Sequence, residues 1–126
     1  MKRPEITSQV TFIYTEELGS TSAFYRDILE LEMVVDQGCC HIYQTGPSSF
    51  IGVCEISERP KNPVGVMLTI VTPEVDRFYA HLLAKGITFE RPPTLSERFN
   101  VYSCLFKGPD GYNIEIQEFK DPDWPL

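Results

Sequence analysis

The sequence has few basic residues and lacks a long apolar stretch. Its 126 residues contain 11 lysines and arginines against 18 aspartates and glutamates, so the formal net charge is −7. An acidic chain without a basic cluster repels nucleic acids and anionic membranes, so we expect neither as a partner. The longest apolar-leaning run, residues 64–71, is far shorter than the ~20 residues that a membrane-spanning helix needs. The first residues carry no signal-peptide pattern.

Cysteine and histidine are also scarce, which limits redox and metal chemistry. The four cysteines, Cys39, Cys40, Cys54 and Cys104, lack the density of a disulfide scaffold, and no secretory pattern accompanies them. We therefore expect reduced thiols in a cytoplasmic protein. The run that ends in His41 places two cysteines side by side, whereas metal-binding cysteine pairs normally have residues between them. We expect no metal at this run.

The composition is otherwise that of a folded globular domain. Hydrophobic residues make up 42% of the chain and aromatic residues 12%, while 10 prolines and 8 glycines are too few for a low-complexity chain. A chain of this length buries roughly two-thirds of its unfolded surface. We therefore expect one domain over residues 1–126, with a core of its own.

Two segments with the same order of elements follow one another. In the first, the β-rich residues 10–15 predict a strand, and residues 21–31 place apolar side chains at helical spacing after a capping Ser20 or Thr21. Three short strands follow, at 33–35, 40–43 and 50–54. In the second, a strand at 64–71 precedes a helix and three more strands, at 87–89, 101–106 and 112–117.

The second helix has the clearest sequence pattern. Its apolar residues recur at i, i+3, i+4, i+7 and i+8 from Val75, which is the spacing of one buried helix face. Thr72 stands at the expected N-cap position and Pro73 in the first turn. Gly86 follows the expected end, where a residue in the left-handed conformation stops a helix.

A polar segment with two prolines separates the two halves. The chain is therefore predicted to be a tandem βαβββ repeat, with modules at 6–56 and 64–119, a linker at 57–63 and a tail at 120–126. A four-stranded sheet with one helix leaves one face uncovered. We expect the two modules to pair their sheets, so that the uncovered faces enclose a cavity.

Three segments in this order carry a family resemblance. Residues 10–14, 23–29 and 108–116 resemble the vicinal oxygen chelate superfamily, which includes glyoxalase I, bleomycin-resistance proteins, extradiol dioxygenases and methylmalonyl-CoA epimerase. The resemblance implies an α+β fold in which tandem βαβββ modules form a U-shaped, mixed and antiparallel sheet around a small-molecule site. It also implies a homodimer, with or without exchange of modules between chains.

In the metal enzymes of that superfamily, four strand positions carry the ligands. The resemblance assigns these positions to Val10, Gly52, Met67 and Glu115, of which only Glu115 is a usual ligand. One carboxylate beside apolar residues cannot hold a divalent transition ion, so we expect no cofactor. A zinc, nickel, iron or manganese site would need further ligands, for which Gln9, His41 and Cys54 are the candidates.

Strand alternation turns one set of side chains inward and predicts a mostly apolar ligand pocket; the alternative is a filled core. The predicted ligand-binding residues on the strands are Phe12, Tyr14, Phe50, Cys54, Met67, Thr69, Tyr102, Asn113, Glu115 and Gln117, with Val10, Val71 and Cys104 beside them. Arg91 and Arg98 lie on a loop placed like a lid.

Glu115 and the two arginines are the chemically active candidates. In an apolar pocket Glu115 can act as a general base; alternatively, it pairs with Arg91 or Arg98. Either arginine can hold an anionic substrate group, or remain a surface charge.

Three functions follow from these residues. The favoured one is a metal-free binding protein similar to the bleomycin-resistance branch, which holds a flat or amphipathic small molecule, with the acidic net charge attracting a cationic one. The first alternative is a metal-dependent lyase or dioxygenase similar to glyoxalase I. The second is a metal-free isomerase or lyase with Glu115 as base, so the sequence leaves open whether the protein is an enzyme.

Overall fold

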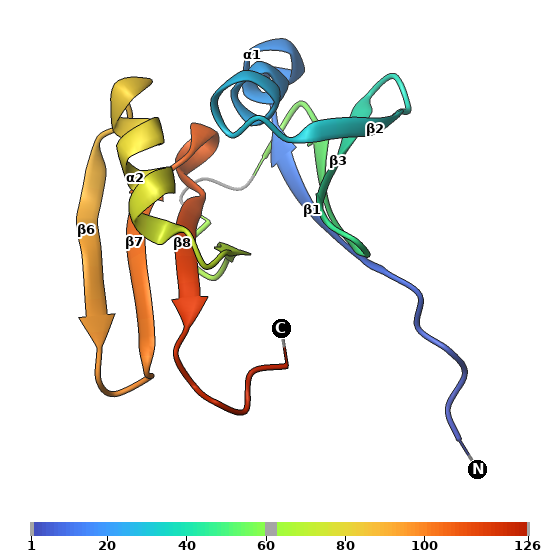
Figure 1. The fold of residues 1–126 in the computed structure, drawn as a ribbon. Coiled ribbons are helices and arrows are strands. Elements are labelled where there is room, and N and C mark those ends of the chain that lie inside the picture. The colour runs from blue at the N-terminus through green and yellow to red at the C-terminus, as the bar shows by residue number, and fades with distance from the viewer. Residues whose placement is uncertain (1, 60–62, 126) are drawn as a thin grey trace. The chain divides into compact units, whose positions relative to one another are not determined.

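The computed structural model describes residues 2–59 and 63–125, so positions 60–62 of the predicted linker lie outside the described residues, as do the two terminal residues. The chain divides into two compact units, Met1–Pro60 and Lys61–Leu126. Each unit has a four-stranded sheet with helical turns of its own (Figure 1). The architecture is α+β.

The two units have the same order of elements. The first contains β1 (Gln9–Thr15), α1 (Leu18–Ala23), a π-helical turn (Phe24–Ile28), β2 (Glu32–Asp36), β3 (Cys40–Gly46) and β4 (Ser49–Glu55). The second contains β5 (Met67–Val71), α2 (Val75–Ala84), β6 (Phe89–Ser96), β7 (Val101–Lys107), a 3-10 turn (Pro109–Gly111) and β8 (Asn113–Phe119). The predicted βαβββ repeat is confirmed. Within the described residues, no helix has the length and apolarity that crossing a membrane requires.

The sheets are mixed and share one topology. The strand order is β1-β4-β3-β2 in the first unit and β5-β8-β7-β6 in the second. The pairs β1–β4 and β5–β8 are parallel, and all other neighbours are antiparallel. Because α1 or α2 connects the first strand of each unit to the edge strand β2 or β6, the hairpins that follow bring β4 and β8 to the centre of their sheets.

Strand alternation separates a buried face from an open face in each sheet. On β1, Ile13 and Thr15 are fully buried on the side of α1, whereas Phe12 is 45% exposed on the other side. In the second unit, Leu82 of α2 is fully buried, as are Phe106 and the two isoleucines of β8. The open faces keep their apolar side chains half-exposed, and they are the faces available for a ligand.

The first helix differs from its prediction. It begins at Leu18, and neither Ser20 nor Thr21 caps it. Glu55 Oε1 instead accepts a hydrogen bond from the Leu18 amide at 3.1 Å, which satisfies one free donor at the helix start. The hydroxyl of Thr21 is hydrogen-bonded to that of Thr15 at 2.8 Å and so joins the helix to β1.

The second helix follows its prediction more closely. It begins at Val75, with Glu74 rather than Thr72 at the N-cap, because Thr72 Oγ1 accepts from the Glu74 amide at 3.1 Å and forms a turn just before the helix. Gly86 has a φ of 90°, the left-handed conformation expected at the helix end.

The predicted lid is a strand rather than a loop. Residues 91–96, which include Pro92 and Pro93, belong to β6, and only residues 97–100 form a turn. Proline lacks an amide donor, but β6 lies at the sheet edge and pairs only with β7, so an irregular register between Arg91 and Thr94 accommodates the two prolines. Arg91 is therefore held on a strand, whereas Arg98 lies in the turn.

Candidate ligand-binding pocket

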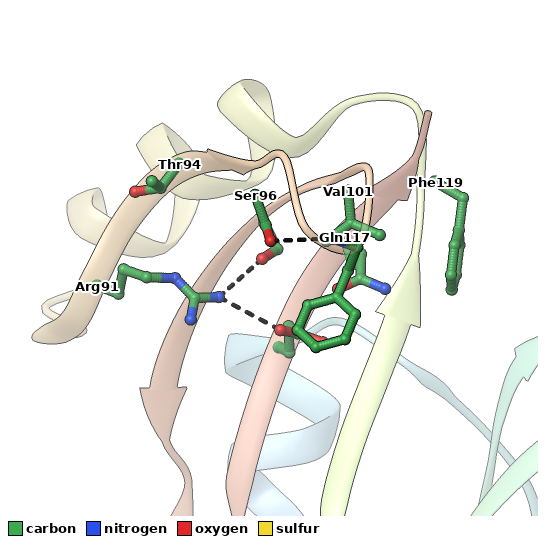
Figure 2. A pocket seen from close by; sticks show the side chains of 9 residues that line it. Arg91, Thr94, Ser96, Val101, Gln117 and Phe119 are labelled. Atoms are coloured by element: carbon green, nitrogen blue, oxygen red, sulfur yellow. Dashed lines mark hydrogen bonds and ion pairs between the residues drawn. The ribbon is translucent and has the colours of Figure 1, made fainter. Parts of the chain in front are cut away.

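A pocket of about 520 Å³ lies on the open face of the second unit's sheet (Figure 2). Three neighbouring strands, β6, β7 and β8, and the turn between β6 and β7 supply its lining. The lining residues are Arg91, Thr94, Ser96, Phe99, Val101, Ser103, Glu115, Gln117 and Phe119. The volume falls within the ~300–1,000 Å³ of small-molecule sites. Six of the nine lining residues are polar or charged, and Phe99, Val101 and Phe119 form the apolar part.

An ion pair between Arg91 and Glu115 crosses this face of the sheet. Arg91 Nη2 donates to Glu115 Oε2 at 3.3 Å and to Ser103 Oγ at 2.7 Å (Figure 2). The other carboxylate oxygen, Oε1, accepts from Thr69 Oγ1 at 3.1 Å. The Glu115 side chain is 16% exposed, against 40% for Arg91. Both carboxylate oxygens therefore have protein donors, and of the two predicted alternatives for Glu115 the structure shows the pairing with Arg91.

Aromatic rings form the apolar side of the pocket. Phe119, at the end of β8, stacks on Trp124 with ring centroids 3.8 Å apart and planes 9° from parallel. Phe99, in the turn, lies 4.9 Å from the Arg98 guanidinium carbon. Arg98 thus flanks a lining residue without lining the pocket itself. The stacked tail holds Phe119 in place, so this wall of the pocket is ordered by contacts outside the sheet.

Some of the residues predicted for the second unit line the pocket, and others lie beside it on the same face of the sheet. Arg91, Glu115 and Gln117 line the pocket, and Thr69 binds Glu115 from β5. Met67 and Asn113 pair with each other on the same face, where Asn113 Oδ1 accepts from Lys107 Nζ at 2.8 Å. Neither lines the pocket.

Tyr102 and Cys104 lie on the opposite face of the sheet, so their predicted place in the cavity is wrong. The Tyr102 hydroxyl donates to Asp76 of α2, and Cys104 is fully buried. Burial raises the pKa of the Cys104 thiol to about 11. The neighbouring residues Val101 and Ser103 line the pocket instead, because a shift of one residue along a strand exchanges its two faces.

Six lining residues were missed by the sequence reasoning: Thr94, Ser96, Phe99, Val101, Ser103 and Phe119. One signal for Phe119 was present, since it continues the alternation of Glu115 and Gln117 along β8. Ser103 follows only from the pairing of β7 with β8, in which it lies opposite Gln117. Thr94 and Ser96 of β6 were missed because this segment was predicted to be a loop.

The remaining predicted residues belong to the open face of the first unit's sheet. Phe12, Tyr14 and Phe50 lie there, and the Phe12 ring covers Gly52: a Cβ at that glycine would lie 2.5 Å from it. Cys54 is bonded to Cys40, directly across the β3–β4 ladder. The expectation of four reduced thiols is therefore wrong for this pair, whereas Cys39 and Cys104 are free.

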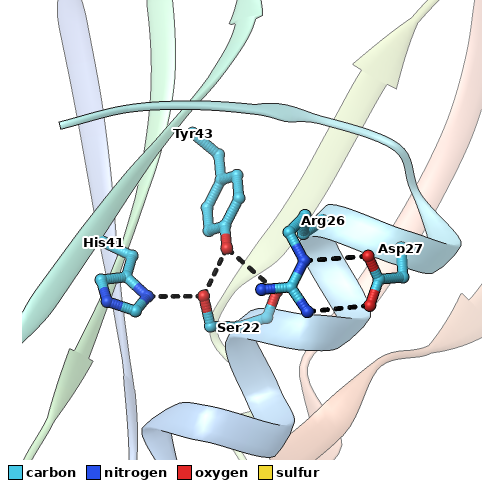
Figure 3. Close-up of polar contacts among 5 residues, drawn as sticks. All are labelled: Ser22, Arg26, Asp27, His41 and Tyr43. Carbon is cyan, nitrogen blue, oxygen red and sulfur yellow. Dashed lines mark hydrogen bonds and ion pairs between the residues drawn. The ribbon is translucent and has the colours of Figure 1, made fainter. Parts of the chain in front are cut away.

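His41 faces α1 rather than the open face, in a small polar network (Figure 3). Ser22 Oγ lies 2.6 Å from His41 Nδ1 and also contacts the Tyr43 hydroxyl, which donates to the Ser22 carbonyl at 3.0 Å. His41 Nε2 lies 3.4 Å from Asp36 Oδ1. These three contacts are satisfied together when His41 Nδ1 donates to Ser22 Oγ, Ser22 donates to the Tyr43 hydroxyl and Tyr43 donates to the Ser22 carbonyl. Ser22 is only 2% exposed, so this network joins α1 to β2 and β3 and offers no accessible nucleophile.

A family model agrees with this architecture. The model described as Glyoxalase/Bleomycin resistance protein/Dioxygenase superfamily matches residues 7–116. The chain belongs to this superfamily. No curated protein matches the sequence.

Solved structures with the same fold include members of this superfamily. A glyoxalase/bleomycin resistance protein/dioxygenase from Nocardioides has 23% identity and a TM-score of 0.75, over 100% of this chain and 90% of that one. A lactoylglutathione lyase from Agrobacterium tumefaciens has 24% identity and a TM-score of 0.75, over 99% and 100%. A virulence protein from Salmonella typhimurium has 20% identity and a TM-score of 0.72, over 94% and 99%. At these identities the likeness shows the fold alone.

The residues present do not fit the metal site of the superfamily's metal enzymes. Of the four positions that the resemblance assigns, Val10 and Gly52 offer no side-chain donor and Met67 only a weak thioether. The further candidates do not complete the set, because Cys54 is in a disulfide and His41 bonds Ser22. Gln9, at the start of β1, would add only a second ligand to Glu115. Within residues 2–59 and 63–125, no three His, Cys, Asp or Glu side chains are grouped as an ion would require.

Proposed function

We propose that this superfamily member binds a small organic molecule in the pocket of its second unit and uses no catalytic metal. The observation that carries the proposal is the ion pair of Glu115 with Arg91. The carboxylate at the expected ligand position accepts from a guanidinium at 3.3 Å and from a hydroxyl at 3.1 Å. A metal would have to displace Arg91 and still lack nitrogen or thiolate partners. A pocket that combines aromatic rings with an Arg91–Glu115 ion pair supports binding of an organic molecule rather than metal chemistry.

Metal content per chain tests the first part of this proposal. The protein is purified without tags or chelators, incubated with zinc, nickel, iron or manganese, and analysed by plasma mass spectrometry beside Glu115→Ala. We expect metal far below one ion per chain and no difference between the two proteins. Near-stoichiometric metal that is lost in Glu115→Ala overturns the proposal and favours the metal-dependent lyase or dioxygenase.

A second candidate function is a metal-free isomerase or lyase in which Glu115 removes a proton. One observation favours it: a carboxylate that is 16% exposed lines the pocket beside a cation able to hold a substrate. Glu115→Gln keeps the size of the side chain and removes the base. A binding protein still binds its ligand in this variant and has no turnover to lose, whereas an enzyme still binds its substrate and loses turnover.

Homodimer formation and a cytoplasmic location are further parts of the proposal. Exposed apolar side chains on the open face of β1 (Val10, Phe12 and Tyr14) support association with a second copy, and light scattering at several concentrations tests it. The Cys40–Cys54 disulfide is the observation against a reducing compartment. Trapping the thiols in intact cells with an alkylating reagent tests the location and the bond together.

A further inference from the structure

Some N–H groups of Arg91 have no acceptor among the described residues, and they influence which ligand the pocket can bind. A guanidinium carries five N–H groups. The contacts of Arg91 with Ser103 and Glu115 both use Nη2, and among the described residues Nε and Nη1 meet no acceptor. The contact with Glu115, at 3.3 Å, is also longer than the ~2.8 Å of a strong charge-assisted bond. Glu115 therefore neutralises Arg91 without saturating it.

A ligand that fills the pocket must replace the water on those donors. The Arg91 side chain is 40% exposed, so its free N–H groups are hydrated before binding. A wholly apolar ligand would leave them without partners, which is costly for a charged donor. A cationic ligand would meet a carboxylate whose two oxygens already accept from Arg91 and Thr69. A ligand with an anionic acceptor is the one that satisfies Arg91 and leaves Glu115 undisturbed.

The rest of the lining sets the shape of such a ligand. Phe99, Val101 and Phe119 offer apolar surface on the same face as Arg91, while Thr94 and Ser96 are neutral. Arg91 and Glu115 are the charged members of the lining, so the local charge is balanced although the whole chain carries −7. A single added negative charge fits this balance better than two, because Glu115 stays beside the guanidinium.

We propose that the pocket selects an organic monoanion, a carboxylate on a compact apolar body, with the carboxylate on Arg91 and the body against Phe99, Val101 and Phe119. This inference rests on the proposed function and reverses the cationic ligand that the net charge alone suggested. The guanidinium of Arg91 sets the preferred charge of the ligand, because attraction by distant surface charges is screened over about 8–10 Å in physiological salt.

Three probes of matched shape test the charge that the pocket prefers. They are 3-phenylpropanoate, 3-phenylpropanamide and 3-phenylpropylamine, added to the full chain. Trp124 is the only tryptophan in the sequence and stacks on Phe119, so its fluorescence reports on the pocket wall. Amide NMR shifts of β6, β7 and β8 locate the binding. We expect the carboxylate to bind on the order of tenfold more tightly than the amide or the amine.

Variants separate Arg91 from the general charge of the protein. Arg91→Gln is expected to lose the preference for the carboxylate, whereas Arg91→Lys keeps most of it. Arg77→Gln on α2 removes the same charge from a side chain that is 81% exposed, away from the pocket, and should change nothing. Glu115→Gln should tighten carboxylate binding several-fold, because it removes the neighbouring negative charge.

The outcomes distinguish this inference from the function on which it rests. Binding of the amide or the amine at least as tightly as the carboxylate, or a preference that survives Arg91→Gln, overturns the monoanion and leaves small-molecule binding in place. If none of the three probes changes Trp124 emission or the pocket amide shifts at millimolar concentration, the pocket is no ligand site and both proposals fail.

Discussion

Breaking the bond between Cys40 and Cys54 is expected to destabilise the first unit. The two residues face each other on β3 and β4 with Cα atoms 4.1 Å apart, the short spacing of a non-hydrogen-bonded antiparallel pair. The bond spans a sequence separation of 14, for which the loss of chain entropy in the unfolded state corresponds to ~3 kcal/mol. Residual hairpin structure in the unfolded chain reduces this effect. We therefore expect a loss of roughly 2–3 kcal/mol in the free energy of unfolding.

The assay compares urea unfolding, followed by circular dichroism, with and without a phosphine reductant. The double variant Cys40→Ala with Cys54→Ala should match the reduced wild type and no longer respond to reductant. Cys39→Ser is the control, because Cys39 is exposed and unbonded. Hydrogen exchange resolved by residue assigns the loss to β3 and β4, since fraying of this hairpin should precede that of the second unit.

Thiol titration of the denatured, unreduced protein decides whether the bond exists. Two free thiols are expected before reduction, from Cys39 and Cys104, and four after it. Four thiols without reductant, or unfolding curves that superimpose with and without it, refute this reasoning and restore the expectation of reduced thiols.

Three other substitutions or conditions test separate parts of the fold. Ser22→Ala removes the hydroxyl that contacts His41 Nδ1 and the Tyr43 hydroxyl, although Tyr43 keeps its bond to the carbonyl of residue 22, and should cost about 1–3 kcal/mol in urea unfolding; Ser20→Ala, on the exposed side of α1, should cost far less. Leu82→Ala should cost about 2–5 kcal/mol because Leu82 is fully buried, and Leu83→Ala, at 46% exposure, should stay below ~1 kcal/mol. Cys104 should resist alkylation at neutral pH, since its pKa is raised to about 11. The stability that its neutral thiol contributes is complete below pH 9 and is lost as pH rises through 11.

Local sequence signals predicted most of the fold. The helical stripe from Val75 and the glycine at position 86 act within a few residues of each other, so α2 and its end were foreseeable. The start of α1 was not, because its first amide is satisfied by Glu55, a residue 37 positions away. The strand character of residues 91–96 was hidden by two prolines, whose tolerance depends on β6 being at a sheet edge.

The candidate site required the register between strands, which a single sequence does not contain. The sequence left open whether Glu115 acts as a base or pairs with Arg91 or Arg98, and the structure shows the ion pair with Arg91. Tyr102 was assigned to the wrong face because the register of β7 was displaced by one residue, which turns the whole strand over. The same limit hid the bond of Cys54, which depends on Cys40 lying directly opposite it.

The two units share one sheet topology, but the open faces of their sheets carry different side chains. Phe12 of β1 pairs with Gly52 of β4, and at the equivalent place in the second unit Thr69 of β5 pairs with Glu115 of β8. In the first unit the Phe12 ring fills the space above the glycine, so the surface at this place is apolar. In the second unit the carboxylate faces a hydroxyl and the guanidinium of Arg91, which leaves unused N–H groups in a pocket. This difference supports the proposal of an anionic ligand, because the guanidinium of Arg91, paired with Glu115, keeps donors for an acceptor in the pocket.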